Sequence, residues 1–145
     1  MKLIELSTTK LASVNLTLNE GKSVVRNYVR INGLIGVRKS LIPSQYHGLL
    51  AKAVFGGTTV NESIVWQTDV FDNFPSRLSD LSGDEYDKYK HILTEALNAY
   101  AQAFSDAENS VKKLLDAAVT CHSDSSVYCA NDRVVITEWG MIPKG

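Results

Sequence analysis

Apolar residues recur at steps of three and four through residues 83–121, the longest regular pattern in the chain. Neither glycine nor proline interrupts this pattern between Asp84 and Thr120. The spacing predicts an amphipathic helix. Ser82 and Glu85 have the spacing of a capping box, which predicts the start of the helix. The apolar positions are Tyr86, Tyr89, Leu93, Leu97, Tyr100, Phe104, Ala107, Val111, Leu114 and Ala118.

Such a helix is long for a chain of 145 residues. About 36 helical residues span roughly 54 Å, whereas a compact chain of this length has a diameter of roughly 38 Å. Either the helix breaks at Ser105, which with Glu108 repeats the capping-box spacing, or it stays whole and pairs with a partner. The residues that would form the partner-binding seam are Leu93, Leu97, Tyr100, Phe104, Val111 and Leu114.

The N-terminal region alternates between apolar and polar residues over short stretches. Lys2–Leu6 and Ser13–Leu18 are predicted strands, and in the second stretch Val14, Leu16 and Leu18 share one face. Residues 19–21, Asn-Glu-Gly, then predict a turn.

The segment Lys22–Ile31 fits both a helix and a strand. Its β-branched residues, followed by Asn32-Gly33, favour a strand that ends in a two-residue hairpin turn. Leu34–Leu41 would then be the returning strand, and Pro43 follows it. In the alternative, Gly33 caps a helix at its C-terminus.

The middle of the chain mixes both kinds of pattern. Ser44–Phe55 is predicted to be a short helix with Leu49, Leu50, Ala53 and Val54 facing inward, and Gly56-Gly57 ends it. The next segment, residues 58–71, predicts one or two strands, and residues 72–75 open a single turn of helix.

A second hairpin is predicted near the C-terminus. Val127–Cys129 and Arg133–Trp139 alternate as strands on either side of Asn131-Asp132. The whole chain, residues 1–145, is therefore expected to be one α+β domain. Its mainly antiparallel sheet, with hairpins at Asn32-Gly33 and Asn131-Asp132, would pack on the long helix, whole or broken.

Composition agrees with an ordinary globular domain, at 44% hydrophobic and 21% charged residues. No secretory signal and no run of roughly 18 apolar residues is found, so we expect a cytoplasmic protein without a membrane partner. Two cysteines, Cys121 and Cys129, are too few for a disulfide framework, and we expect both to be reduced.

Charge is unevenly distributed along the chain. Residues 1–52 have eight basic and two acidic residues, whereas the remainder has seven basic and 14 acidic residues. This asymmetry has three explanations: the basic and acidic parts face each other within one fold, they meet between subunits, or the basic part binds an anion. The candidate anion-binding residues are Lys22, Arg26, Arg30 and Lys39, and a hairpin at Asn32-Gly33 would place Arg26 opposite Lys39.

The sequence lacks the motifs of common chemistries. It contains no dinucleotide fingerprint, phosphate-binding loop, nucleophile elbow or zinc-protease motif. A zinc site built from Cys121, His122 and Cys129 has poor spacing. Nothing places Cys121 beside His47, His91 or His122 as a nucleophile and its base. We therefore predict no catalytic residue, metal or cofactor.

These patterns favour a non-enzymatic protein, an assembly or adaptor module that binds itself or a protein partner through the long helix and the oppositely charged surfaces. One alternative is a protein that binds anions or nucleic acid through the basic residues Lys22, Arg26, Arg30 and Lys39, although the slightly acidic chain makes nucleic acid the less favoured partner. Another is a small enzyme with an unfamiliar site.

Overall fold

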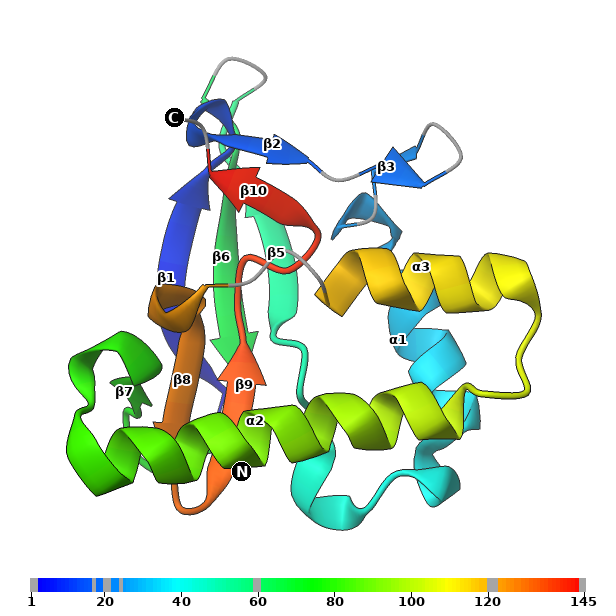
Figure 1. Cartoon of the computed structure of the whole chain (residues 1–145). Helices are drawn as coiled ribbons and strands as arrows, with labels where there is room; N and C mark the ends of the chain where they lie inside the picture. Colours follow the sequence, from blue (N-terminus) through cyan, green and yellow to red (C-terminus); the bar gives the residue numbers. More distant parts are fainter. Residues whose placement is uncertain are drawn as a thin grey trace.

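The fold is α+β, as predicted, with two three-stranded antiparallel sheets and three helices (Figure 1). The computed structural model describes residues 3–16, 18–19, 22–23, 25–58, 61–119 and 123–143. One sheet has the order β1 (Ile4–Lys10), β6 (Ser63–Thr68), β5 (Lys52–Gly56). The other has the order β7 (Ser76–Arg77), β8 (Val127–Ala130), β9 (Arg133–Ile136).

The two sheets meet where the chain enters β5. Leu50 forms an isolated parallel bridge with Ile136 of β9. The N–H of Ile136 donates to the carbonyl of Leu49 at 2.6 Å, and the N–H of Ala51 donates to the carbonyl of Ile136 at 2.9 Å. Backbone hydrogen bonding is therefore continuous from β5 to β9, which fixes the two sheets relative to each other.

Two short strand pairs complete the β structure. β2 (Val14–Leu16) pairs with β10 (Met141–Pro143), and β3 (Leu18–Asn19) pairs with β4 (Lys22–Ser23). The N-terminal strand predictions are therefore confirmed with shifted bounds. The predicted turn at residues 19–21 falls between β3 and β4, but Glu20 and Gly21 lie outside the described residues.

The long helical pattern is broken, as one of the two alternatives predicted. α2 (Gly83–Ala103) ends just before Phe104, and α3 (Asn109–Val119) turns back beside it (Figure 1). Capping differs from the prediction: the side chain of Ser82 makes no capping bond, and α3 begins after Glu108, whose carbonyl accepts from the N–H of Lys112 at 3.0 Å. The reversal lets the apolar faces of both helices reach the same core.

The predicted hairpin at Asn32-Gly33 is wrong, because α1 (Tyr28–Val37) runs through this dipeptide. β4 and the short helix η2 (Val25–Asn27) precede α1, and η3 (Lys39–Leu41) follows it. Helical spacing places Tyr28, Ile31, Leu34 and Ile35 against the core. In a strand, Val29 would lie on the same face as the buried Ile31, yet Val29 is 83% exposed. The alternative prediction, a helix capped by Gly33, is right that the segment contains a helix. It places the end too early, because α1 continues four residues beyond Gly33.

The helix predicted over residues 44–55 is also wrong. A single turn, η4 (Ser44–Tyr46), is followed by extended chain that becomes β5. Leu49, Ala51 and Ala53 are buried in alternation, which is the period of a strand. The four residues assigned to one helical face are therefore divided between the two faces of extended chain.

The remaining elements agree with the sequence. β6 lies within residues 58–71, and η5 (Leu78–Asp80) is the single turn expected before α2, although it starts after Pro75 and β7. β8 and β9 form the predicted C-terminal hairpin, preceded by η6 (Asp124–Ser126). Asn131 and Asp132 have φ of 50° and 62°, the left-handed conformation that a two-residue hairpin turn requires.

The core is centred on Trp139, which is fully buried. Its ring centroid lies 5.7 Å from the ring centroid of Trp66 on β6 and 5.7 Å from that of Tyr28 on α1. Its indole N–H donates to the carbonyl of Ala51 at 2.8 Å. One side chain therefore links the first sheet, the junction between the sheets and α1, with its polar atom satisfied.

Candidate functional site

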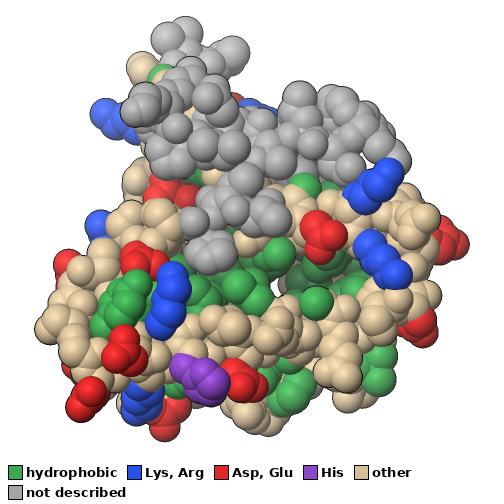
Figure 2. Space-filling view, viewed as in Figure 1, with side chains coloured by type: hydrophobic (Ala, Val, Ile, Leu, Met, Phe, Trp, Pro, Cys, Tyr) green, Lys and Arg blue, Asp and Glu red, His purple; other side chains and the backbone are tan. Residues whose placement is uncertain are grey.

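The candidate partner-binding seam is mostly used inside the protein. Leu93, Tyr100, Phe104 and Leu114 are buried, and Leu97 and Val111 are half-buried. Leu97, Tyr100 and Phe104 line a groove of about 260 Å³ between α2 and α3, together with Leu115 and Val119. Figure 2 shows the hollowed, largely hydrophobic surface between these helices. That the seam binds a partner stays a prediction, with only Leu97 and Val111 partly accessible.

Three of the four candidate anion-binding residues lie on three successive elements of the chain. Arg26 lies in η2, Arg30 in α1 and Lys39 in η3, and the side chain of Lys22 lies outside what the structure describes. Because the hairpin does not form, Arg26 does not face Lys39 across a sheet. The assignment of these residues to one anion-binding surface stays a prediction.

Arg26 is held by an ion pair. Its guanidinium donates to the Glu62 carboxylate at 2.6 and 3.2 Å and lies 4.9 Å from the Phe55 ring centroid. The hydrogen bonds from Arg26 lower the pKa of Glu62, and those same bonds raise the pKa of Arg26. This pair supports the interpretation that basic and acidic segments meet within one fold.

Arg38, which the sequence analysis did not single out, makes a similar contact. It donates to the Asp106 carboxylate at 2.6 Å and to the carbonyl of Ala103 at 3.1 Å. Its guanidinium also lies 5.2 Å from the Phe104 ring centroid. The hydrogen bond lowers the pKa of Asp106. Arg38 thus ties the end of α1 to the break between α2 and α3.

The outward side of α1 is unusually apolar. We call Val29, Arg30, Gly33 and Val37 the α1 outer face, since they follow each other along one side of the helix. Val29 and Val37 are each 83% exposed, and a Cβ placed on Gly33 would meet no atom within 4 Å. Leu41, in η3, is 60% exposed. Arg30 is the single charged member of the α1 outer face.

A second distinctive surface lies where the chain enters α2. We call this the acidic end; it comprises Phe74 and the exposed carboxylates Asp72, Asp80, Asp84, Glu85 and Asp87. Phe74 is 63% exposed, although its ring makes an edge-to-face contact with the ring of Tyr128, with centroids 6.2 Å apart. Acidic side chains gather over the N-terminal part of α2, at the lower left of Figure 2.

A cleft of about 560 Å³ lies between α1, the turn after η4 and the ends of β6 and β9. We call it the α1 cleft. It contains cationic, anionic and apolar groups, and Lys39 is the one candidate anion-binding residue that lines it. Its lining residues are Asn32, Ile35, Gly36, Lys39, His47, Gly48, Asp69, Val70, Tyr100 and Arg133.

Hydrogen bonds fix several side chains of the α1 cleft. His47 Nε2 lies 2.7 Å from the carbonyl of Ile42 and 3.1 Å from that of Lys39. Because carbonyls only accept, Nε2 carries a proton and Nδ1 remains for other partners. Tyr100 donates to the carbonyl of Tyr46 at 2.8 Å, and burial raises the pKa of Tyr100.

Arg133 supports the same wall of the cleft. Its Nη2 donates to the carbonyls of His47 at 2.7 Å and Ser44 at 3.3 Å. Its Nε is buried and has no hydrogen-bond partner among the described residues. A buried donor without an acceptor is costly, so Nε of Arg133 is a local cost to the stability of the fold. Sequence reasoning missed Arg133 because its contacts come from residues far along the chain.

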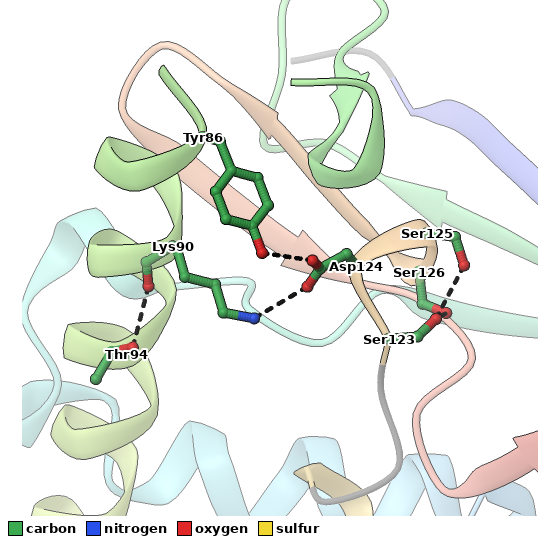
Figure 3. Close-up of polar contacts among 7 residues, drawn as sticks. All are labelled: Tyr86, Lys90, Thr94, Ser123, Asp124, Ser125 and Ser126. Atoms are coloured by element: carbon green, nitrogen blue, oxygen red, sulfur yellow. Dashed lines mark hydrogen bonds and ion pairs between the residues drawn. The ribbon is translucent and has the colours of Figure 1, made fainter. Parts of the chain in front are cut away.

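A polar cluster joins η6 to α2 (Figure 3). Tyr86 and Lys90 of α2 donate to the two carboxylate oxygens of Asp124, at 2.6 and 3.0 Å. Both hydrogen bonds raise the pKa of their donors. In the same short helix η6, Ser126 donates to Glu138 at 3.1 Å. These groups satisfy one another, which is the arrangement of a structural anchor.

The candidate metal and nucleophile residues give no site within the described chain. Cys121 and His122 lie outside the described residues, and no group of three metal-ligating side chains is found among those that are described. Cys129 is buried, which raises the pKa of its thiol to about 12. None of the described helices is both long and apolar enough to span a bilayer.

Neither a family model, nor a curated protein, nor a solved structure matches this chain. Function must therefore be inferred from the geometry of the molecule itself. The α1 outer face, the acidic end and the α1 cleft are the features that structural packing leaves unexplained.

Proposed function

We propose that this protein is a self-associating assembly module, acting by binding rather than by catalysis. In this proposal the α1 outer face of one copy binds the acidic end of the next. The observation that carries it is the concentration of exposed apolar side chains in one short segment. Of the five large hydrophobic side chains exposed in the described chain, Val29, Val37 and Leu41 fall within 13 consecutive residues.

An exposed apolar cluster favours a protein interface. Single exposed hydrophobic residues are common, but clustered ones mark interaction surfaces. α1 is apolar on its outward side as well as its inward side, and a helix apolar on both sides is normally covered on both. Gly33 lies between Val29 and Val37, so the helix surface there is low enough for another surface to approach closely.

Charge complementarity supports a second copy as the occupant. Residues 21–61 contain six basic residues and no acidic one, whereas residues 62–87 contain seven acidic residues and one basic one. Arg30 on the α1 outer face would face the carboxylates of the acidic end, and Phe74 would supply an apolar contact. Opposed potentials of this kind orient and accelerate association.

The positions of the two surfaces imply head-to-tail association. α1 and the N-terminus of α2 lie on opposite sides of the molecule, at the right and left of Figure 1. Two different surfaces of one chain form a heterologous contact, which generates a ring if it closes and a filament if it does not. Each copy would then keep one surface free until closure.

The test is the solution mass of the full chain, measured by light scattering over a concentration series at 50 and 500 mM salt. We expect oligomers at low salt that weaken at high salt, because exposed charges are screened. Val37→Glu should raise the dissociation constant roughly tenfold or more, because it places like charge against the acidic end. The double variant Asp84→Lys with Asp87→Lys should do the same from the other surface.

Mixing the two defective variants distinguishes head-to-tail binding from a symmetric contact. Each variant alone should be monomeric, and the mixture should give a dimer and nothing larger, because each retains one intact surface. Leu3→Glu, at an exposed apolar residue outside both surfaces, serves as the control and should assemble normally. A monomeric parent chain at high micromolar concentration would refute the proposal, as would a mixture that stays monomeric.

A further inference from the structure

We propose that the α1 cleft binds a small organic carboxylate, with the carboxylate group beside Lys39 and Arg133 and a short apolar body directed toward the core. This activity is independent of self-association, because Lys39 and Arg133 belong to neither the α1 outer face nor the acidic end. It gives the protein a ligand as well as a protein partner.

The volume and lining of the cleft fit a small molecule. Its volume of about 560 Å³ lies within the range typical of small-molecule sites. Such sites combine apolar walls with a few converging polar groups. In the α1 cleft Ile35 and Val70 supply apolar wall, and Lys39, His47 and Arg133 supply polar atoms.

A smaller cavity extends the cleft toward the core. It has a volume of about 40 Å³ and shares Asn32, Ile35, Gly48 and Tyr100 with the cleft. Its other lining residues are Tyr28, Ile31, Leu49 and Leu50. Since apolar side chains predominate there, the recess suits an apolar end of a ligand and not its charged group.

The charge balance of the cleft favours an anion. Lys39 and Arg133 are cationic, whereas Asp69 is the single acidic residue among the described residues that line it. Burial raises the pKa of Tyr28, and the negative charge of Asp69 adds to that effect, so Asp69 lies within electrostatic reach of Tyr28. An anion beside Lys39 and Arg133 would still experience some repulsion from Asp69. Removing the charge of Asp69 should therefore strengthen anion binding, whereas removing the charge of Lys39 should weaken it.

Arg133 provides the most specific argument. Two backbone carbonyls hold its Nη2, so the guanidinium is positioned before any ligand arrives. Its Nε–H lacks an acceptor among the described residues. A carboxylate has two oxygens that accept from a guanidinium in a planar arrangement, which is why arginine recognises carboxylates well. Nε itself has almost no accessible surface, so a carboxylate in the cleft would lie beside the charge of the guanidinium and not against this buried atom.

Two glycines show that the cleft is closely packed at Gly48 and open at Gly36. A Cβ on Gly48, whose φ is +77°, would lie 2.7 Å from Val70 Cγ2, so this wall is closely packed. A Cβ on Gly36 would meet no atom within 4 Å. A large side chain at Gly36 can therefore occupy the cleft without disturbing the core.

The experiment is an NMR titration of the full-length, isotopically labelled chain with three ligands that share one tail. Hexanoate, hexylammonium and hexanol differ in the charge and polarity of their head groups. We expect hexanoate to shift the amide signals of Gly36, Gly48 and Arg133 with a millimolar dissociation constant. Stronger binding of hexylammonium, equal binding of all three, or hexanoate shifts confined to the groove between α2 and α3 would overturn the proposal.

Substitutions of Lys39 and Asp69 should change the affinity for hexanoate in opposite directions, which a general loss of structure would not do. Lys39→Met should weaken hexanoate binding roughly two- to fivefold, and Asp69→Asn should strengthen it by a similar factor, as expected for exposed charges. Lys113→Met, on the exposed side of α3, is the control and should leave the affinity unchanged. Unchanged affinity in both cleft variants would refute the assignment of the carboxylate to this cleft.

Filling the cleft tests its location. Gly36→Phe should abolish the hexanoate shifts while the rest of the amide spectrum stays folded. Gly33→Phe changes the same helix outside the cleft lining and should retain binding. Retained binding in Gly36→Phe, or equal loss in both variants, would contradict the proposed location.

Discussion

Two dipeptides in this chain, Asn32-Gly33 and Asn131-Asp132, carry the same local preference for a two-residue hairpin turn. Asn131-Asp132 forms that turn, with both residues at positive φ, whereas Asn32-Gly33 lies in the middle of α1. Turn chemistry alone therefore does not determine the structure at either place. The difference must come from the residues that flank each dipeptide.

The flanking residues differ in how they can bury their apolar side chains. Around Asn131-Asp132, strands β8 and β9 bury consecutive residues in the core, and the turn is also tied to α2. The N–H of Asp132 donates to the Tyr89 hydroxyl at 3.2 Å, and Lys88 pairs with the Asp132 carboxylate at 2.5 Å. Around Asn32-Gly33 the helix buries Ile31 and packs Leu34 and Ile35 against the core, and this burial outweighs the preference for a turn.

The largest expected change in stability comes from removing the buried side chain of α1. Ile31 is the only fully buried residue of α1, so Ile31→Ala should lower the free energy of unfolding by about 2–5 kcal/mol. Urea denaturation followed by circular dichroism measures this change. Val29→Ala, at an exposed residue of the same helix, should change stability by less than about 0.5 kcal/mol. Equal effects of the two substitutions would mean that local preference, not burial, maintains α1.

A second test addresses the turn that does form. Asp132 has φ of 62°, so Asp132→Val should cost about 1–2 kcal/mol because a β-branched residue is strained there. Asp132→Asn keeps the tolerance for positive φ and removes only the exposed charge, so we expect a loss below about 0.5 kcal/mol. Thermal unfolding of both variants gives the comparison. Similar losses would assign the stability to the Lys88 ion pair instead of the backbone.

The comparison also explains which parts of the fold were predictable. A long periodic pattern and a strand pair with a clear turn between its strands gave correct elements: the helical pattern of residues 83–121 with its break near Ser105, and the β8–β9 hairpin. Errors occurred in residues 22–55, where apolar residues are dense enough to fit both periods. There the choice between helix and strand depends on contacts such as the pairing of β5 with β6, which no local window contains.

The candidate sites were predictable only in outline. Charge counting indicated opposed surfaces, but it could not reveal that Glu62 pairs with Arg26 or that Lys39 is the one candidate anion-binding residue in the lining of the α1 cleft. Arg133 escaped notice because its partners, Ser44 and His47, are more than 80 residues away in sequence. A cleft assembled from distant segments leaves no periodic signal.

A third test asks whether one substitution, Gly33→Ala, raises or lowers the free energy of unfolding. Gly33 lies in a helix interior with open space around it, so Gly33→Ala should raise the free energy of unfolding by about 0.8–1.0 kcal/mol. In a hairpin turn the same change would destabilise the protein, because alanine is strained at positive φ. Chemical denaturation decides between them. Gly57→Ala is the control and should destabilise, since φ is +89° and the added Cβ would lie close to the Asn61 carbonyl.

The smallest test concerns the ion pair that joins η2, just before α1, to the start of β6. The pKa of Glu62 is lowered by its hydrogen bonds to Arg26, so the pair stabilises the fold at neutral pH. This contribution is lost as pH falls through the lowered pKa, because the carboxyl then becomes neutral. Arg26→Gln should return the pKa of Glu62 toward its ordinary value, as measured by carbon NMR of the side-chain carboxyls. The pKa of Asp106, which Arg38 lowers, should not move in this variant. If the pKa of Glu62 is unchanged by Arg26→Gln, the pair does not form in solution, and the buried side chain of Val25 would then be the contact that attaches η2 to the core.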